Sequence, residues 1–166
     1  MILDVLEIPH PLLKTRAHLL EPTQAGLQPF IDDMIETMNH FPRCVGLAAT
    51  QVGKPWRLIV MDAGRVDKPG SQHGRIILLN PYLVEKKGQT LLREGCQSVP
   101  HFTANVVRAT YVEVHGRDRA GNVVEIKAHG FEAIVFQHEL DHLDGILFLD
   151  RVASADTDVF RRKTFL

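Results

Sequence analysis

The histidine pair His138 and His142 constrains the fold and chemistry of this chain more than any other sequence feature. The two residues are four apart in the run Gln137–His142, so on a helix their imidazoles lie on one face and can reach one metal ion. Glu139 lies at the edge of that face, where it can reach a metal-bound water. Composition predicts only about 0.03 chance occurrences of this pattern in such a chain, so two ordinary surface histidines are the weaker interpretation.

A largely apolar helix carries this pair. Gly130 opens the helical stretch and Gly145 ends it. Apolar residues at steps of three and four predict another helix over residues 24–40. The other expected elements are a buried strand at 57–62, a loop at 63–74, a strand at 75–84, a hairpin formed by 106–115 and 122–129 with its turn at 118–121, and a closing helix at 156–163.

The order of these elements predicts the fold class. Strands with hairpin-type links occupy the middle of the chain and helices flank them, which favours an α+β fold over an alternating βαβ chain. Asn80-Pro81 interrupts the strand at 75–84. Because proline cannot donate a ladder hydrogen bond, we expect that strand at a sheet edge.

Composition and charge narrow the class of protein. A chain of 166 residues with 45% hydrophobic and 23% charged residues is typical of one globular domain, so we expect residues 1–166 to form a single domain. A formal net charge of −1 argues against specific nucleic-acid binding. The N-terminus lacks the pattern of a signal peptide and no apolar run is long enough to span a membrane. We therefore expect a soluble cytoplasmic protein with no membrane partner.

Two histidines do not complete a catalytic metal site, which needs a third protein ligand. One class of zinc proteases places a third histidine six residues after the second, but this chain has Phe148 there. Another class uses a downstream glutamate, and no glutamate follows Glu139. Asp150 and Asp156 remain possible without a supporting motif. An ordinary zinc endoprotease is therefore disfavoured, and we look upstream for the ligand.

Two upstream segments offer candidates. Cys96 follows a glycine and precedes Pro100, which suggests a shaped strand end, and a thiolate binds zinc or ferrous iron well. A small buried hydrophobe is the alternative role for this cysteine. The segment 44–53 combines small residues with Gln51, whose amide could face a ligand. By itself that segment is just as easily a tightly packed strand and turn.

Taken together, the three segments resemble peptide deformylase. The family's motifs appear in order as Gly46–Gln51 (GLAATQ), Glu94–Ser98 (EGCQS) and Gln137–His142 (QHELDH), with further similarity at Ile8–Leu13 and Leu143–Phe148. The resemblance covers nearly the whole chain. It implies an α+β fold with mostly antiparallel β-sheets around a central metal-binding helix.

The resemblance also implies a function and residue roles. The family's enzymes remove the N-formyl group from the N-terminal formylmethionine of newly made polypeptides, and a metal-bound hydroxide attacks the formyl carbon. The implied metal ligands are Cys96, His138 and His142, with Glu139 as general base and then acid. The implied oxyanion donors are the side-chain amide of Gln51 and the backbone N–H of Gln97. The peptide would bind as an added strand along Val45, Gly46 and Gly95, and Val45, Phe131, Ile134 and Val135 would line the methionine pocket.

The cofactor implied is one divalent metal ion. Ferrous iron (Fe2+) is expected in the cell, and Zn2+, Ni2+ or Co2+ could occupy the same ligands in purified protein. Nascent N-formyl-methionyl peptides are the expected partners, with transient ribosome contact. Arg161-Arg162-Lys163 could touch ribosomal RNA, although a solvated helix end is the simpler interpretation.

The chain departs from the family pattern at three positions. Cys44 replaces a glycine and places a second, potentially oxidisable sulfur near the site, while Gln97 and Thr103 replace a common leucine and arginine. Around the motifs, we expect Glu94 to pair with Arg108 and brace the cysteine, and Asp141 to support the helix or a neighbouring arginine.

Two further functions stay open on the sequence alone. A related metallohydrolase could cut another small amide, since Gln97 and Thr103 change the pocket. A structural metal module without catalysis is the other alternative. Three evident ligands rather than four argue against it, because structural sites are normally closed.

Overall fold

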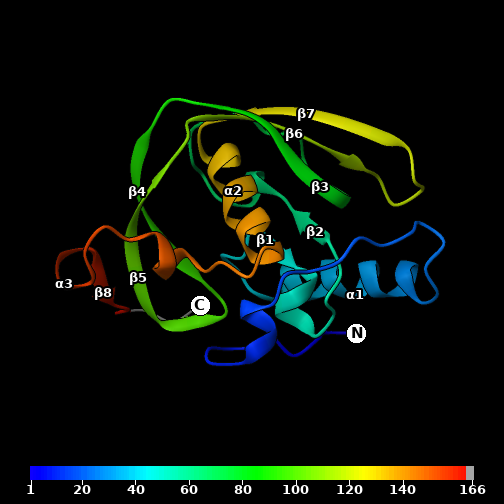
Figure 1. Ribbon diagram of the computed structural model, residues 1–166, viewed down its shortest axis with the longest axis horizontal. Coiled ribbons are helices and arrows are strands. Elements are labelled where there is room, and N and C mark those ends of the chain that lie inside the picture. The colour runs from blue at the N-terminus through cyan, green and yellow to red at the C-terminus, as the bar shows by residue number, and fades with distance from the viewer. Residues whose placement is uncertain (164–166) are drawn as a thin grey trace.

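The computed structural model describes residues 1–163, which form two antiparallel sheets and three α-helices (Figure 1). The strands are β1 (Gly46–Ala48), β2 (Leu58–Met61), β3 (Ile76–Lys87), β4 (Thr90–Cys96), β5 (Val99–Arg108), β6 (Tyr111–Arg117), β7 (Val123–His129) and β8 (Val159–Arg161). The α-helices are α1 (Leu27–His40), α2 (Phe131–Leu143) and α3 (Ala155–Asp158), and 3-10 turns span η1 (Pro11–Lys14), η2 (Ala49–Val52), η3 (Ala63–Arg65) and η4 (Phe148–Arg151). The larger sheet has the order β1-β2-β3-β6-β7 and the smaller one β4-β5-β8, so the predicted α+β class is confirmed.

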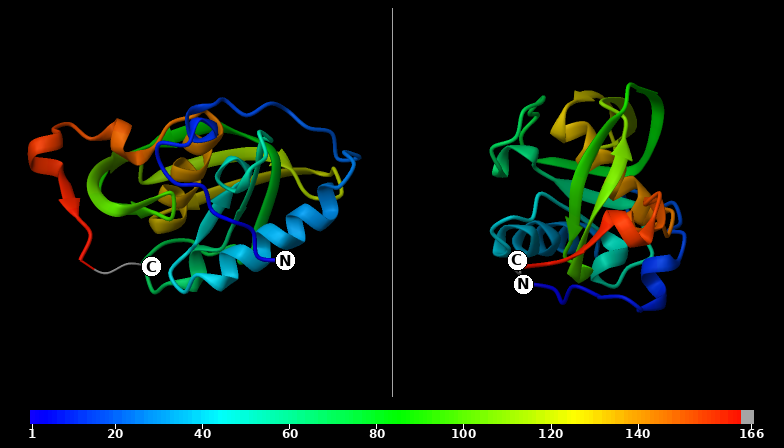
Figure 2. Two further views of the ribbon diagram at one scale, coloured as in Figure 1. Left: turned by 90° about the horizontal axis from the view of Figure 1, so that it is seen from below. Right: turned by 90° about the vertical axis from the view of Figure 1, so that its left-hand side faces the viewer.

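Helix α2 lies at the centre of the molecule, with strands of both sheets around it (Figures 1 and 2). Phe136 and Leu143 are fully buried and belong to one apolar cluster with Met61 and Val112 of the larger sheet. Burying each such side chain stabilises the fold by roughly 1.5–3 kcal/mol. The helix begins after Gly130 and ends before Gly145, as predicted, and both glycines have positive φ.

Strand β2 is buried on both faces, which explains why its sequence is continuously apolar rather than alternating. Ile59 and Met61 pack in the cluster of α2, whereas Leu58 and Val60 pack in the cluster of α1. The apolar stripe of α1 therefore covers the opposite face of the larger sheet. The predicted helix over 24–40 is confirmed, with its first α-helical residue at Leu27.

The prediction of an edge position for the strand around Pro81 is wrong. β3 is the central strand of the larger sheet, between β2 and β6. Its register with β6 shifts between Leu79 and Tyr82, so Pro81 lies in a bulge where no ladder donor is required. Asn80 adopts φ 52° there, and its side-chain amide exchanges hydrogen bonds with the backbone of Leu20 at 2.8 and 3.0 Å.

Two boundaries also differ from the sequence expectations. Residues 106–108 end β5 instead of opening the hairpin, whose first strand begins at Tyr111. The closing helix over 156–163 is wrong beyond Asp158, because the chain becomes extended and β8 pairs with β5. This pairing gives the free edge of β5 a partner, and it opposes Val159 to Ala104 and Phe160 to Thr103.

Within residues 1–163, no helix combines the length and the apolar character needed to cross a membrane.

Candidate metal centre

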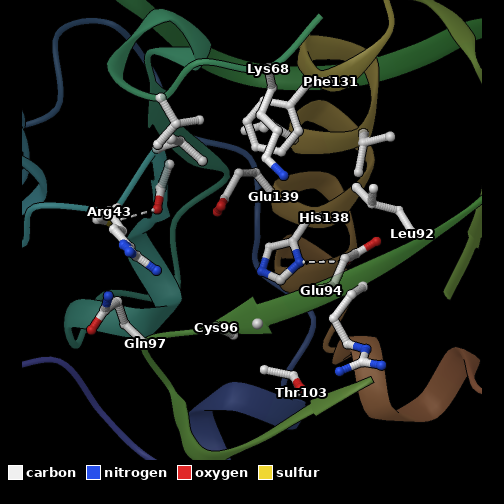
Figure 3. Close-up of a pocket in the computed structure, with 18 of the residues that line it drawn as sticks. Arg43, Lys68, Leu92, Glu94, Cys96, Gln97, Thr103, Phe131, His138 and Glu139 are labelled. Carbon is white, nitrogen blue, oxygen red and sulfur yellow. Dashed lines mark hydrogen bonds and ion pairs between the residues drawn. The ribbon is translucent and has the colours of Figure 1, made fainter. Parts of the chain in front are cut away.

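The end of β4 and one face of α2 bring Cys96, His138 and His142 together. Figure 3 shows Cys96 and His138 at the cleft. Cys96 Sγ lies 3.3 Å from His142 Nε2, and the Nε2 atoms of the two histidines lie 3.2 Å apart. One potential ligand atom from each residue lies within 4.8 Å of the others. Cys96 and His142 are buried, and His138 is half-buried at the wall of a cleft.

These distances fit a single transition-metal ion. Ligand atoms at the usual zinc bond lengths in a tetrahedral arrangement are separated by about 3.3–3.6 Å. The Nδ1 atom of His138 lies 2.9 Å from Glu94 Oε1, and donation of its proton to that carboxylate leaves the Nε2 lone pair free for a metal. Burial lowers the pKa of His142 well below its usual value, so His142 is neutral as a ligand must be.

The other positions considered for a third ligand do not join the histidine pair. Phe148 is buried and stacks against His138, with ring centroids 6.2 Å apart. Asp150 pairs with Lys14 and accepts a hydrogen bond from the Leu147 N–H at 2.8 Å. Asp156 is exposed on α3. The predicted upstream cysteine is therefore the residue that the fold places beside the histidine pair.

A buried ionic network holds the cysteine strand against α2. Arg108 donates to both carboxylate oxygens of Glu94, at 2.6 and 2.9 Å, and to Asp141 at 2.7 Å. Arg151 completes the network by donating to Asp141 at 2.6 and 2.8 Å. Burial alone would raise the pKa of Glu94, but hydrogen bonds from Arg108 and His138 outweigh it and lower that pKa to about 2. The predicted pairing of Glu94 with Arg108 and the supporting role of Asp141 are both confirmed.

We expect the substitution Glu94→Gln to weaken this network. It leaves the Arg108 charge buried with one fewer anion, so the free energy of unfolding should fall by up to about 3 kcal/mol. Replacing the anionic acceptor of the His138 N–H with a neutral amide should weaken metal binding about 10- to 100-fold. Chemical denaturation and metal titration measure the two effects. Glu85→Gln, which breaks the exposed pair with Lys87, is the control that should change neither. Unchanged metal affinity in Glu94→Gln would contradict the bracing role.

Glu139 lies beside the three candidate ligands and has almost no contact with solvent. The side chain is 3% exposed, and its Oε2 atom has no hydrogen-bond partner among the described residues. Burial raises the pKa of Glu139 to about 7; the charge of Glu94 adds to this, and His138 and Arg108 oppose it. A bound divalent cation would draw that pKa down again. A carboxyl group whose pKa lies between its ordinary value and about 7 can both accept and return a proton near neutral pH.

Strand β1 and turn η2 form the opposite wall of the site. At Gly46, a Cβ atom would lie 2.7 Å from Glu139 Oε1, so only glycine lets the strand approach the carboxylate this closely. Gln51 is buried, and its Oε1 accepts from the Ala48 N–H at 3.0 Å. Its Nε2 donates to Ser98 Oγ at 3.0 Å and to Cys96 Sγ at 3.4 Å. The amide of Gln51 is thus held in place beside the candidate metal ligands.

One cleft of about 510 Å³ opens onto this centre. Its apolar wall includes the predicted pocket residues Val45, Phe131, Ile134 and Val135. The other predicted site residues on its surface are Gly46, Gln51, Gly95, Cys96, Gln97, His138 and Glu139. His142 lies behind this surface, 1% exposed. The structure therefore gathers the residues of all three sequence motifs at a single cavity.

The thiol of Cys44 differs from what the sequence suggested, and Gln97 has a buried atom unpaired within residues 1–163. Burial, with help from the charges of Glu139 and Cys96, raises the pKa of Cys44 to about 12, so this residue is a protonated thiol that donates to the Gly46 carbonyl at 3.2 Å. Such a thiol is a poor nucleophile and a poor target for oxidants. The amide nitrogen Nε2 of Gln97 is buried without a partner among the described residues.

Four cations on the cleft surface were not anticipated as site residues. They are Arg43, Lys68, Arg93 and Arg162. Arg162 was expected at a solvated helix end, but β8 replaces that helix and carries the side chain to Gly95. The sequence holds no local signal for this placement, because it depends on the pairing of β8 with a strand 55 or more residues earlier.

Fold and site together define a metal-dependent hydrolase: one cysteine sulfur and two imidazoles within reach of one ion, a buried carboxyl group beside them, and an open cleft. The family model of polypeptide deformylase matches residues 2–158. The chain belongs to this family.

Individual relatives are similar to this chain over nearly its whole length. A peptide deformylase from Syntrophobacter fumaroxidans is 44% identical over 162 residues, which cover 98% of this chain and 93% of the relative. The crystal structure of a peptide deformylase from Legionella pneumophila is 38% identical, has a TM-score of 0.84, and covers 92% of this chain and 87% of its own. The crystal structure of the peptide deformylase from Thermotoga maritima is 34% identical and also has a TM-score of 0.84. The match covers 93% of this chain and 99% of that one.

Proposed function

We propose that this chain is a peptide deformylase, which hydrolyses the N-formyl group from the N-terminal formylmethionine of newly made polypeptides and releases formate. The observation that carries the proposal is the position of Glu139 beside Cys96, His138 and His142 at one cleft. Membership of the polypeptide deformylase family supports the same reaction.

Cys96, His138 and His142 would hold one divalent ion, with Fe2+ as the ion in the cell and Zn2+, Ni2+ or Co2+ as substitutes in purified protein. Thiolate and imidazole donors suit all four ions. When bound, the ion supplies a more acidic water at neutral pH and polarises the formyl carbonyl. Glu94 would orient His138 through the Nδ1 hydrogen bond.

Glu139 serves as base and then as acid. Its carboxylate takes a proton from the attacking water and returns it to the departing amine, and its buried position keeps bulk water from competing. The side-chain amide of Gln51 and the backbone N–H of Gln97 donate to the oxygen that becomes negative during attack. Donors fixed before the reaction stabilise that charge by about 2.7–4 kcal/mol each.

The peptide binds in extended form between two sheet edges. β1 and β4 are both edge strands, and both line the cleft through Gly46 and Gly95. Unpaired backbone groups on such edges accept an added strand, with Val45 extending the surface at β1. The methionine side chain enters the apolar wall formed by Phe131, Ile134 and Val135.

Three broader proposals accompany this function. Residues 1–166 act as one catalytic domain, a proposal supported by the cavity that both sheets share. The chain works in the cytoplasm, where formylated nascent chains arise, and contacts the ribosome transiently. Arg161 and Lys163 are the exposed basic residues left for such a contact, because Arg162 lies in the cleft.

Formate release from a formyl-methionyl dipeptide tests the proposed function. We expect turnover by protein purified anaerobically with Fe2+, loss of turnover after chelation, and recovery when Fe2+ or Ni2+ is restored. An acetyl-methionyl dipeptide is the matched control and should be hydrolysed far more slowly. Absent turnover with stoichiometric metal would overturn the proposal, and a preference for the acetyl group would point to a hydrolase for another small amide.

A further inference from the structure

The guanidinium of Arg162 lies directly over the backbone of Gly95. A Cβ atom at Gly95 would lie only 2.4 Å from Arg162 Nη2 and 3.4 Å from Cζ. Gly95 is in the edge strand that lines the cleft, one residue before Cys96. The absence of a side chain at Gly95 thus makes room for the Arg162 guanidinium, which comes from a segment distant in the sequence.

The position of Arg162 is fixed by its strand. β8 pairs with β5, and the Arg162 N–H donates to the His101 carbonyl at 2.8 Å just beyond the last paired residues. The guanidinium of Arg93 stacks on the Phe160 ring at 3.5 Å and adds a second attachment of β8 to the smaller sheet. Arg161, the neighbour of Arg162, is exposed, as expected for alternate residues of an extended segment.

The charge of Arg162 has no anion to neutralise it within residues 1–163. Its Nε atom is buried and has no hydrogen-bond partner there, and no carboxylate of the described chain pairs with its guanidinium. Burial lowers the pKa of this group, while the charge of Cys96 opposes the change. A partly dehydrated and unpaired guanidinium is a strong site for a carboxylate, which it can bind through two parallel hydrogen bonds.

The surrounding charges strengthen this conclusion. Arg43 and Lys68 line the same cleft, and neither forms an ion pair with a described residue (Figure 3). Of the carboxylates on the cleft surface, Glu94 is neutralised by Arg108 and Glu139 lies at the metal ligands, which leaves exposed Asp67. The mouth of the cleft is therefore cationic, although the whole chain has a formal net charge of −1.

We infer that Arg162 is a specificity-determining residue that binds an acidic side chain at the second or third residue of the formyl peptide. This inference rests on the proposed function and on a peptide that pairs with β4. Residues paired across two strands project to the same face, so the peptide residue beside Gly95 points its side chain to the face that Arg162 occupies. An aspartate or glutamate there meets the unpaired guanidinium.

The test compares isosteric peptides that differ in one charge. The substrates are formyl-Met-Asp-Ala and formyl-Met-Ala-Asp with amidated C-termini, each matched by its asparagine counterpart. We expect the chain to favour at least one aspartate peptide over its counterpart in kcat/KM, and Arg162→Gln to lower kcat/KM on that peptide about tenfold through KM. Turnover of the asparagine peptides should change less than twofold. Arg162→Lys should retain part of the preference, and Arg161→Gln is the matched control that should retain all of it.

The outcomes separate this inference from the proposed function. Turnover of all four peptides without any preference for aspartate overturns the role of Arg162 and leaves deformylation intact. Equal losses on charged and neutral peptides in Arg162→Gln also overturn it, because they indicate a structural role for the side chain. Failure of the unsubstituted chain on every peptide, with metal bound, would instead remove the proposed function itself.

Discussion

Replacing Glu139 with alanine should abolish deformylation while leaving the metal bound. The three candidate ligands come from Cys96, His138 and His142, so the substitution removes no ligand. It removes the group that moves the proton, and general acid–base catalysis contributes about 10²- to 10⁴-fold to a rate. Because one carboxyl group serves in both proton transfers, we expect kcat to fall by about 10³-fold or more. Stopped formate assays with matched metal analysis measure this directly.

Two controls make the Glu139 result specific. Glu139→Gln preserves the volume of the buried side chain and removes only its basicity, so it should lose as much activity as the alanine variant. Glu125→Ala alters an exposed glutamate of β7 and should change neither kcat nor metal content. Activity within tenfold of the unsubstituted chain in both Glu139 variants would exclude Glu139 as the base.

Helix α2, which carries both histidines, could be predicted from the sequence because its signals are local. Four-residue spacing places His138 and His142 on one helical face, and Gly130 and Gly145 mark the two helix ends. Helix α1 could be predicted equally well, since its apolar stripe repeats every three or four residues. In both cases the residues that decide the structure lie within a few turns of one another.

The features that the sequence did not predict depend on pairing between strands that lie far apart in the chain. Pro81 was predicted at a sheet edge, but the bulge that accommodates it in a central strand depends on the register between β3 and β6. Arg162 was expected in a solvated helix end, and only the pairing of β8 with β5 brings it to the cleft. For the same reason, residue spacing alone did not identify Cys96 as the partner of the histidines; the family resemblance did.

Gly46→Ala should lower kcat strongly although it changes no ionisable group. The new Cβ would lie 2.7 Å from Glu139 Oε1 and 3.0 Å from its Cγ and Cδ atoms, closer than such contacts normally occur. Glu139 is buried at 3% exposure, so its carboxylate cannot move away into solvent. A displacement of about 1 Å in a catalytic group can cost about 10²-fold in rate, and we expect a loss of kcat of that size. Metal content should remain unchanged, because Gly46 contributes no ligand.

A double-mutant cycle determines whether Gly46→Ala acts through Glu139. If the methyl group works by displacing the carboxylate, adding it to Glu139→Ala should cost little more than Glu139→Ala alone, because the displaced group is already absent. If Gly46 instead acts mainly by pairing with the peptide backbone, the two losses should multiply and KM should rise. The cycle thus separates two roles of one glycine: close approach to the base, which lowers kcat, and contact with the added strand, which raises KM.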